Sequence, residues 1–435
     1  MEIPRVNSHR FLGVILDHKL NGKSHFKHLI NKGQNIININ MALSGIKWGA
    51  HPGLLLTIYR SVLRSSIEYG CQFFSWSIQS SEFTKLLRIQ YKAIRKAMGY
   101  RISTPINVML SEAREPPLHH RFTLSISKYI YKAMAHKFSP AYLALKQMDL
   151  VATSKNLKIQ AIQDSFQFRN LFKAYVLSRH VKKTIHRSAY PTAFWHKLEV
   201  ISSEINYIRD MLECDTNNPP EFIAPQFLHK SLDYRLNAIT IYTDGSKEPG
   251  NPVGAGVYLS DLGISIAHKL PAQTSIFSAE LWAIYQATLL ARDCGHNNTT
   301  IFSDSKNALD AISNNKYFQR NYIIYYIKQS ILNASKEGTN IALFWIPSHS
   351  GITGNETIDS IAKDAAINGT IPEFRIPHED LFYESNNKAS AQFKDYLKTA
   401  ASFKGVLHFA RYQLLRIPGL RTLLLIEKKL SRLTG

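Results

Sequence analysis

Hydrophobic and polar positions alternate most clearly in the second half of the chain. The run Ile239-Thr240-Ile241-Tyr242-Thr243 is rich in β-branched residues and ends at Asp244-Gly245, which predicts a buried strand followed by a turn. Antiparallel strands followed by alternating helices and strands predict an α/β fold, a mixed five-stranded sheet flanked by helices. The expected elements after that first strand are strands near 252–259 and 264–269, helix 278–292, strand 300–303, helices 305–313 and 321–335, strand 340–346 and helix 355–367.

The first half of the chain is dominated by helical spacing instead. An apolar run over residues 11–17 predicts one strand, and helices are expected over 54–70 and 82–98. Apolar residues line one side of the second helix, and its other side carries five basic residues: Lys85, Arg88, Lys92, Arg95 and Lys96. Residues 136–213 also show helical spacing, most clearly over 201–208, and two helical stretches follow near 386–400 and 404–415.

Composition narrows the class of protein. The chain has 435 residues, 45% of them hydrophobic, which is enough for two or three packed domains. Its three cysteines are far apart and have no metal-ligand spacing, so we expect a reducing compartment. The N-terminus has no apolar signal segment, and no apolar run reaches the ~18 residues of a membrane span. We therefore expect an intracellular protein of the nucleus or cytoplasm that is not secreted and does not enter a membrane.

The net charge of +21 is unevenly distributed. Residues 237–369 hold 9 Lys/Arg and 11 Asp/Glu, whereas residues 1–236 carry an excess of 18 positive charges. A basic region joined to a nearly neutral one indicates that the first holds a polyanion on which the second acts. The alternative is a basic surface that serves only solubility.

Four acidic residues of the second half lie where predicted strands and helices begin or end: Asp244, Glu280, Asp304 and Asp359. Each has an ordinary structural explanation when taken alone. Asp244 could form a turn, Glu280 could complement a helix dipole, Asp304 could cap a helix and Asp359 could face solvent. Their common position at element ends is what indicates shared chemistry.

Together with their neighbours, these acids resemble the type 1 ribonuclease H family. The resemblance covers residues 237–368 and implies that Asp244, Glu280, Asp304 and Asp359 bind metal and act in catalysis. It also implies that His349, in a loop before the last helix, assists hydrolysis and product release. The matching motifs are Tyr242-Thr243-Asp244-Gly245-Ser246, Gly254-Ala255-Gly256-Val257, Ala279-Glu280-Leu281, Ser303-Asp304-Ser305, Trp345-Ile346-Pro347-Ser348-His349-Ser350-Gly351 and Gly354-Asn355-Glu356.

The chemistry of phosphodiester hydrolysis agrees with that set of residues. Two divalent ions can activate a water and stabilise the leaving oxygen, and they also relieve the repulsion among crowded carboxylates. Oxygen ligands without cysteine or histidine suit Mg²⁺, with Mn²⁺ as a substitute. An imidazole can exchange protons at neutral pH. The expected function is an endoribonuclease that hydrolyses the RNA strand of RNA–DNA hybrids with two Mg²⁺ ions.

The N-terminal half resembles the end of a reverse transcriptase from a non-long-terminal-repeat retrotransposon of the jockey or I type. The resemblance implies a last palm strand and a mostly helical thumb over residues 1–135. It also implies a polyprotein truncated at its N-terminus, since the polymerase aspartates of that family would lie before residue 1. The motifs are Phe11-Leu12-Gly13-Val14, Tyr59-Arg60-Ser61-Val62-Leu63, Glu68-Tyr69-Gly70, Gln90-Tyr91-Lys92-Ala93-Ile94-Arg95, Ser103-Thr104-Pro105 and Glu115-Pro116-Pro117-Leu118.

The expected organisation follows from these two resemblances. A helical connection over 136–213 and a proline-rich linker over 214–236 separate the two regions, and a helical tail occupies 369–435. A different functional class stays open, namely a catalytically inactive remnant that only binds nucleic acid. A transposase or integrase of similar fold is disfavoured, because those proteins lack the Asp-Gly-Ser and His-Ser-Gly motifs. Protein partners are not indicated by any motif.

Overall fold

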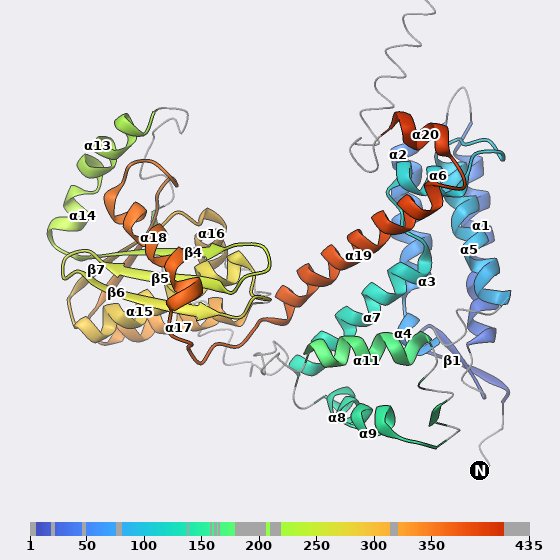
Figure 1. Cartoon of the computed structure of the whole chain (residues 1–435), viewed down its shortest axis with the longest axis horizontal. Helices are drawn as coiled ribbons and strands as arrows, with labels where there is room; N and C mark the ends of the chain where they lie inside the picture. Colours follow the sequence, from blue (N-terminus) through green and yellow to red (C-terminus); the bar gives the residue numbers. More distant parts are fainter. Residues whose placement is uncertain are drawn as a thin grey trace, which may run out of the picture. The chain divides into compact units, whose positions relative to one another are not determined.

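The chain divides into two compact units (Figure 1). Unit 1 takes residues 1–131, 143–178 and 385–435, and unit 2 takes residues 132–142 and 179–384. A computed structural model describes residues 6–18, 22–45, 49–74, 81–136, 139–156, 159–160, 163, 166–178, 206–208, 219–313 and 321–412.

Unit 2 is built on a mixed β-sheet with the strand order β3-β8-β7-β4-β5-β6. Strands β4, β5 and β6 pair antiparallel, while β4, β7 and β8 pair parallel, which confirms the expected mixed α/β sheet. Five of the strands are those predicted from the sequence. The strands are β3 (Asn206–Ile208), β4 (Ile239–Lys247), β5 (Val253–Leu259), β6 (Ile264–Leu270), β7 (Asn298–Ser303) and β8 (Asn340–Trp345).

The sixth strand corrects the prediction of a helix over residues 201–208. Residues 206–208 pair in parallel with Ala342–Phe344 of β8. The outer edge of β8 offers backbone donors and acceptors, and pairing with that edge outweighs the weak helical pattern of a short segment. Helices form over much of 140–178, but residues 179–205 and 209–218, and with them most of the expected connection, lie outside the described residues.

Helices cover both faces of this sheet (Figure 1). Ile223, Phe227 and Ile358 pack with Tyr242 and Phe302 in one buried cluster, so α13 and α18 share a face of the sheet. The opposite face receives α15, whose first turn lies against β4 at Gly245. The helices are α13 (Pro220–Lys230), α14 (Leu232–Leu236), α15 (Ile276–Cys294), α16 (Lys306–Ser313), α17 (Tyr322–Lys336) and α18 (Thr353–Asn368).

Helices α13 and α14 also correct the linker expected over 214–236. Pro219 and Pro220 begin a helix there, because proline suits the first helical positions. Phe227 is fully buried, and its ring meets Phe302 edge-on at 5.0 Å. Residues 220–236 therefore belong to the packed body of unit 2.

Two glycines allow the helices to approach the β4–β5 hairpin closely. A Cβ atom at Gly254 would lie 1.8 Å from the carbonyl oxygen of Ala362, so α18 packs directly on β5. A Cβ atom at Gly245 would lie 2.9 Å from the backbone nitrogen of Glu280, which α15 carries. The glycines of the Asp-Gly-Ser and Gly-Ala-Gly motifs are thus required by packing.

The N-terminal half begins with a β-hairpin where the sequence predicted one strand. Strands β1 (Ser8–Phe11) and β2 (Val14–Asp17) pair antiparallel, and Leu12 and Gly13 turn the chain with positive φ angles of 46° and 87°. The apolar run is continuous across this turn, so its periodicity did not reveal the reversal.

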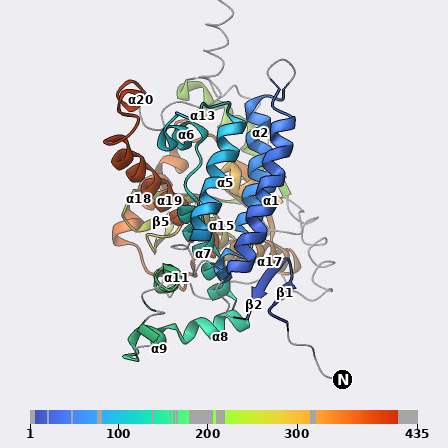
Figure 2. The same cartoon turned by 90° about the vertical axis from the view of Figure 1, so that its right-hand side faces the viewer.

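The other elements that the structure describes up to residue 178 are helices. Figure 2 shows α1 and α5 packed along each other. The expected helices over 54–70 and 82–98 are confirmed, the first as α2, η1 and α3 and the second as α5, and the first contains a π-helical turn. The helices are α1 (Lys23–Ala42), α2 (Pro52–Ile58), η1 (Tyr59–Arg64), α3 (Ser65–Glu68), α4 (Cys71–Phe74), α5 (Ser81–Ala97), α6 (Ile106–Ala113), α7 (Leu118–Ala135), α8 (Pro140–Lys146), α9 (Met148–Thr153) and α11 (Phe166–Ser178).

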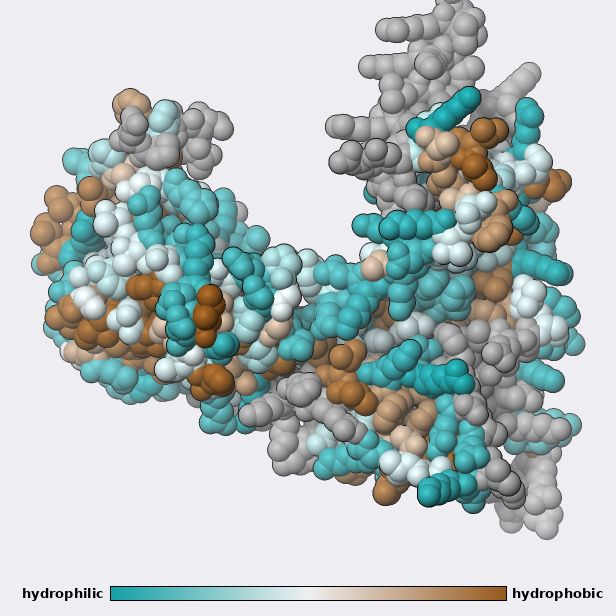
Figure 3. Space-filling model, in the orientation of Figure 1, coloured by the Kyte–Doolittle hydropathy of each residue, from teal (hydrophilic) through white to brown (hydrophobic). Residues whose placement is uncertain are grey.

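The C-terminal tail contributes to both units. Helix α19 (His378–Ala401) places its first turn in unit 2, while its later residues Phe393 and Leu397 are buried in unit 1. The side of α19 that faces the viewer in Figure 3 is mostly hydrophilic. Helix α20 (Val406–Arg411) follows, and residues 413–435 lie outside the described part. None of the described helices combines the length and the apolar character needed to cross a bilayer.

Candidate active site

Three of the four predicted acids meet at one end of the sheet in unit 2. Asp244 lies on β4, Asp304 follows β7, and Glu280 is the fifth residue of α15, just past its first turn. Because β4 and β7 are parallel neighbours with Thr243 opposite Ser303, the residues after these two positions emerge side by side. One carboxylate oxygen from each of the three acids lies within 4.8 Å of the other two.

Neighbouring residues hold the backbone of this acidic cluster in place. The Ser275 side chain caps α15 by accepting a hydrogen bond from Ser278 N at 3.1 Å. The indole Nε1 of Trp345 donates to the carbonyl oxygen of Asp304 at 3.1 Å. The approach of Gly245 to Glu280 N fixes β4 against α15. The three carboxylates are therefore presented by rigid elements.

Burial and mutual repulsion favour the protonated forms of these acids. Asp244 and Glu280 are each 7% exposed. Burial, with the charges of Asp304 and Asp359, raises the pKa of Asp244 to about 7. Burial, with the charges of Asp244 and Asp304, raises the pKa of Glu280 well above its ordinary value. Burial also raises the pKa of Asp304, although a hydrogen bond from Asn355 and the charge of His349 oppose that rise.

A divalent cation fits the needs of this cluster. The Oε2 atom of Glu280 is buried and has no hydrogen-bond partner in the described part of the chain. Within the same described residues, no lysine or arginine forms an ion pair with Asp244, Glu280 or Asp304. Carboxylate oxygens are ligands that Mg²⁺ and Mn²⁺ prefer. The chain thus supplies negative charge and oxygen ligands, and a bound cation would supply the missing positive charge.

Asp359, the fourth predicted ligand, lies at the rim of the cluster. It is on α18, its side chain is 32% exposed, and its Oδ2 is 2.6 Å from Nζ of Lys363. Asp359 is not one of the three residues whose oxygens lie within 4.8 Å of one another. Its charge nevertheless helps to raise the pKa of Asp244 and that of Asp304, so it lies within electrostatic range of both.

His349 lies on the loop between β8 and α18, as the sequence predicted. It is exposed and has a left-handed φ of 51°, which is uncommon for a residue other than glycine. The Ser350 hydroxyl closes this loop by donating to the carbonyl oxygen of Pro347 at 2.7 Å. The charge of His349 lowers the pKa of Asp304, which places the imidazole within electrostatic range of the acidic cluster.

Two residues near the site were not assigned a role from the sequence. Asn355 is buried and hydrogen-bonds the Asp304 carboxylate, while Lys363 pairs with Asp359. Asn355 belongs to the Gly354-Asn355-Glu356 motif, which was a signal for its importance. Lys363 follows Asp359 by four residues on one helix, a spacing that predicts an ion pair.

A hollow of about 350 Å³ opens in unit 2 near the end of β4. Its lining residues include Ser246, two residues after Asp244, and Lys363, four residues after Asp359, together with Lys269 and Glu248. The amine of Lys269 donates to the carbonyl oxygen of Ile367 at 2.9 Å. Two lysines thus line a hollow close to the carboxylates.

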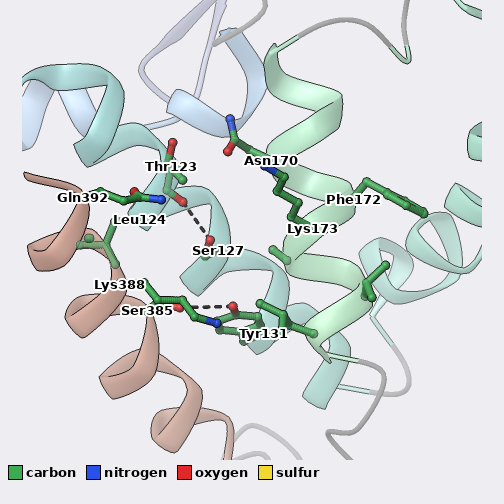
Figure 4. Close-up of a pocket in the computed structure, with 14 residues that line it drawn as sticks. Thr123, Leu124, Ser127, Tyr131, Asn170, Phe172, Lys173, Ser385, Lys388 and Gln392 are labelled. Carbon is green, nitrogen blue, oxygen red and sulfur yellow. Dashed lines mark hydrogen bonds between the residues drawn. The ribbon is translucent and has the colours of Figure 1, made fainter. Parts of the chain in front are cut away.

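Unit 1 contains a separate cavity of about 410 Å³ between α7, α11 and α19 (Figure 4). Ser127 donates to the carbonyl oxygen of Thr123 at 3.0 Å, and the Ser385 and Tyr131 hydroxyls lie 3.2 Å apart. Lys173 and Lys388 also line it, and none of its lining residues is acidic. This cavity has no group of side chains that matches a catalytic arrangement.

Comparison with protein families agrees with the geometry of unit 2. Residues 236–367 match the family model for RNase H. The matched segment begins just before β4, ends within α18, and contains all five predicted site residues. This part of the chain is an RNase H domain.

Proposed function

We propose that the RNase H domain cleaves the RNA strand of RNA–DNA hybrids with two divalent metal ions. The observation that carries this proposal is the cluster of Asp244, Glu280 and Asp304. Three elements bring these carboxylates within 4.8 Å of one another, in the family context that uses such a cluster.

Each residue of the site would have a separate role in the reaction. Asp244, Glu280 and Asp304 would hold the ions, and Asp359 at the rim would complete the set once its bond to Lys363 opens. When bound, the ions would activate a water molecule and stabilise the leaving oxygen. Asn355 orients the Asp304 carboxylate through its hydrogen bond. His349, exposed on its loop, is placed to carry a proton between this site and solvent.

A hybrid substrate suits the surroundings of the site. Lys269 and Lys363 line the hollow beside the site and would attract a phosphate backbone. The excess of positive charge in residues 1–236 would add to that attraction. Contacts with 2′-hydroxyl groups would distinguish the RNA strand from the DNA strand.

We also propose that the N-terminal half derives from the reverse transcriptase of a retrotransposon. Residues behind that resemblance are connected around the buried Glu115: Arg60 and Arg64 pair with Glu115, and Gln90 donates to the carbonyl oxygen of Pro116 at 3.0 Å. Three separate motifs of the sequence thus meet in one structural feature of unit 1.

The test of the nuclease function is direct. Purified full-length chain is incubated with an RNA–DNA hybrid labelled on the RNA strand, with Mg²⁺ or with EDTA. We expect cleavage of the RNA only with Mg²⁺, and a loss of at least about 10³-fold in Asp244→Asn, because removing several kcal/mol of metal stabilisation costs that much in rate. DNA duplex of the same sequence is the control and should stay intact.

Two outcomes would count against the proposal. Cleavage that persists in EDTA or in Asp244→Asn would exclude the metal-carboxylate mechanism. Binding of the hybrid without any cleavage would favour the inactive nucleic-acid-binding alternative, which the pairing of Asp359 with Lys363 also suits.

A further inference from the structure

The first turn of α15, which directly precedes Glu280, is bonded to a carboxylate from α19. Asp380 accepts a hydrogen bond from Ser275 N at 2.9 Å and one from the Ser275 hydroxyl at 2.8 Å. It accepts a third from the Ser278 hydroxyl at 2.9 Å. The amide Nδ2 of Asn321, at the start of α17, donates to that same Ser278 hydroxyl at 2.8 Å. Three segments distant in sequence therefore meet at the N-terminus of α15.

This network lies in the interior of unit 2. Asp380 is 5% exposed, Ser278 is fully buried and Asn321 is 7% exposed. A buried carboxylate is costly unless its oxygens accept hydrogen bonds, and both Asp380 oxygens do so. Its negative charge also lies at the positive end of the α15 dipole. The bonds between Asp380 and the start of α15 are therefore strong and specific.

The network lies beside the acidic cluster. Glu280 follows Ser278 by two residues, and one of its carboxylate oxygens lies within 4.8 Å of carboxylate oxygens of Asp244 and Asp304. Ionised carboxylates at such a distance repel one another, and this repulsion opposes the approach of α15 to β4. Gly245 contacts the first turn of α15 on the β4 side, and Asp380 anchors the same turn through Ser275 and Ser278. Without this anchor the turn could yield to the repulsion, and Glu280 would move away from the other two carboxylates.

We propose that Asp380 is a positioning residue that holds the first turn of α15, so that Glu280 reaches the metal ions. This inference rests on the proposed function for the identity of the site. Asp380 lies outside the RNase H match, which ends at residue 367. The working nuclease unit of this chain therefore includes the start of α19.

Metal affinity distinguishes positioning from simple anchoring of α19. The experiment measures Mn²⁺ binding by calorimetry on the full chain, well below the melting temperature of each variant. In Asp380→Asn one carboxylate oxygen is replaced by an amide NH2 group, which cannot accept a hydrogen bond, so at least one of the three hydrogen bonds is lost. We expect about 10-fold weaker Mn²⁺ binding, the lower end of the effect of residues that orient metal ligands. Asp395→Asn, an exposed position on the same helix, should bind like the wild type.

A second variant covers the case in which Asp380→Asn does not fold. Ser278→Ala removes the hydroxyl that joins Asp380 to Asn321 and should weaken Mn²⁺ binding in the same direction by a smaller factor. Since the two residues act through one bond, the double variant should lose less than the product of the single effects. The Mg²⁺ concentration for half-maximal cleavage should rise, while hybrid affinity measured without metal should not change.

The outcomes separate this inference from the nuclease function. Wild-type affinity for Mn²⁺ in folded Asp380→Asn and Ser278→Ala would overturn it, even if their melting temperatures fall. A wild-type chain that binds no Mn²⁺ would also overturn it. A chain that binds Mn²⁺ with the expected loss in the variants, yet cuts no hybrid, would refute the nuclease function and leave the positioning role standing.

Discussion

The two units of this protein treat buried carboxylates in opposite ways. In unit 1, Glu115 is 1% exposed and pairs with Arg60 at 2.6 Å and with Arg64 at 2.9 Å. In unit 2, Asp244 and Glu280 are nearly as buried, but they face each other and Asp304 without an ion-pair partner among the described residues. The same chemical group is paired with arginines in one unit and has no cationic partner among the described residues in the other.

That difference separates a structural role from a chemical one. The Glu115 pairs tie η1 to the corner between α6 and α7, where Arg60 also donates to the carbonyl oxygen of Ala113 at 2.8 Å. The acidic cluster ties no elements together and instead opposes their approach, because its charges repel. A cation bound from outside the chain would offset this repulsion among the carboxylates. The burial of an acidic residue therefore indicates whether its role is structural or chemical only when its partners are known.

The largest effect is expected from removing Glu115, the buried carboxylate that pairs with arginines in unit 1. Glu115→Ala removes the carboxylate partner of Arg60 and one of the two carboxylate partners of Arg64, which keeps Glu68. It should destabilise unit 1 by about 3 kcal/mol, the lower end of the cost of breaking a buried pair. Native-state hydrogen exchange of residues 59–68 measures this loss. Glu337→Ala, which removes an exposed pair with Arg292, is the matched control and should cause no measurable change. Equal protection in the Glu115 variant would show that this network does not hold unit 1 together.

Removing a carboxylate from the acidic cluster of unit 2 should change the stability of the metal-free protein in the opposite direction. The pKa of Asp244 is about 7 in the folded chain and ordinarily 3.8, so the folded state binds this proton more tightly. That preference stabilises the fold fully below pH 4 and is lost as the pH rises through 7. Asp244→Asn should therefore stabilise metal-free protein by roughly 2–4 kcal/mol at pH 8 and much less at pH 4. Thermal unfolding in EDTA at both pH values measures this, and destabilisation at pH 8 would contradict it.

A smaller effect is expected from removing His349, which lies within electrostatic range of the acidic cluster. If His349 carries protons during turnover, His349→Ala should slow hybrid cleavage by up to about 10²-fold, the lower end of general acid–base effects. Mn²⁺ affinity should stay the same, because His349 is not one of the clustered ligands. His296→Ala, another exposed histidine of unit 2, is the control. An unchanged cleavage rate in His349→Ala would show that this loop takes no part in the reaction.

The smallest effect is expected from three exposed cations of α5, Lys85, Arg88 and Lys96. Arg95 is left out of this set, because it donates hydrogen bonds to the carbonyl oxygens of Arg101 and Thr104. If the exposed face of α5 contacts phosphates, neutralising it should lower the slope of log affinity against log salt by about 0.9 per lost contact. The variant is Lys85→Gln/Arg88→Gln/Lys96→Gln, and the control with the same charge change is Lys155→Gln/Lys336→Gln/Lys398→Gln. Equal slopes in hybrid-binding titrations of the two triple variants would mean that α5 offers only a solvated face.

Strong periodicity explains why most of unit 2 could be predicted from sequence. Strands β4 to β8 and helices α15 to α18 lie within a few residues of their expected bounds. The failures have a common cause, which is that tertiary contacts decided the outcome. Strand β3 depends on the open edge of β8, and the helix over 220–230 depends on the space that Phe227 fills beside Phe302.

Tertiary contacts also limited what could be predicted about the candidate site. Asp244, Glu280 and Asp304 could be found because their motifs are local in sequence, and their order matched a known pattern. The partners that set their geometry and charge could not be found in this way. Asp380 acts on Ser275 across 105 positions, and its own neighbours in sequence form no recognisable motif. Asp359 was identified as a ligand, but its position at the rim of the cluster, where it pairs with Lys363, became evident only from the structure.

The division of α19 between the two units has a consequence for synthesis on the ribosome. Unit 1 needs Phe393 and Leu397, but these residues follow the whole of unit 2 in the chain. Residues 179–384 take roughly 10–40 s to translate at about 5–20 residues per second. During that interval the apolar surface of unit 1 that packs against Phe393 and Leu397 stays uncovered while unit 2 is synthesised and folds. Unit 2 is therefore the first part of the protein that can be finished, although it begins second.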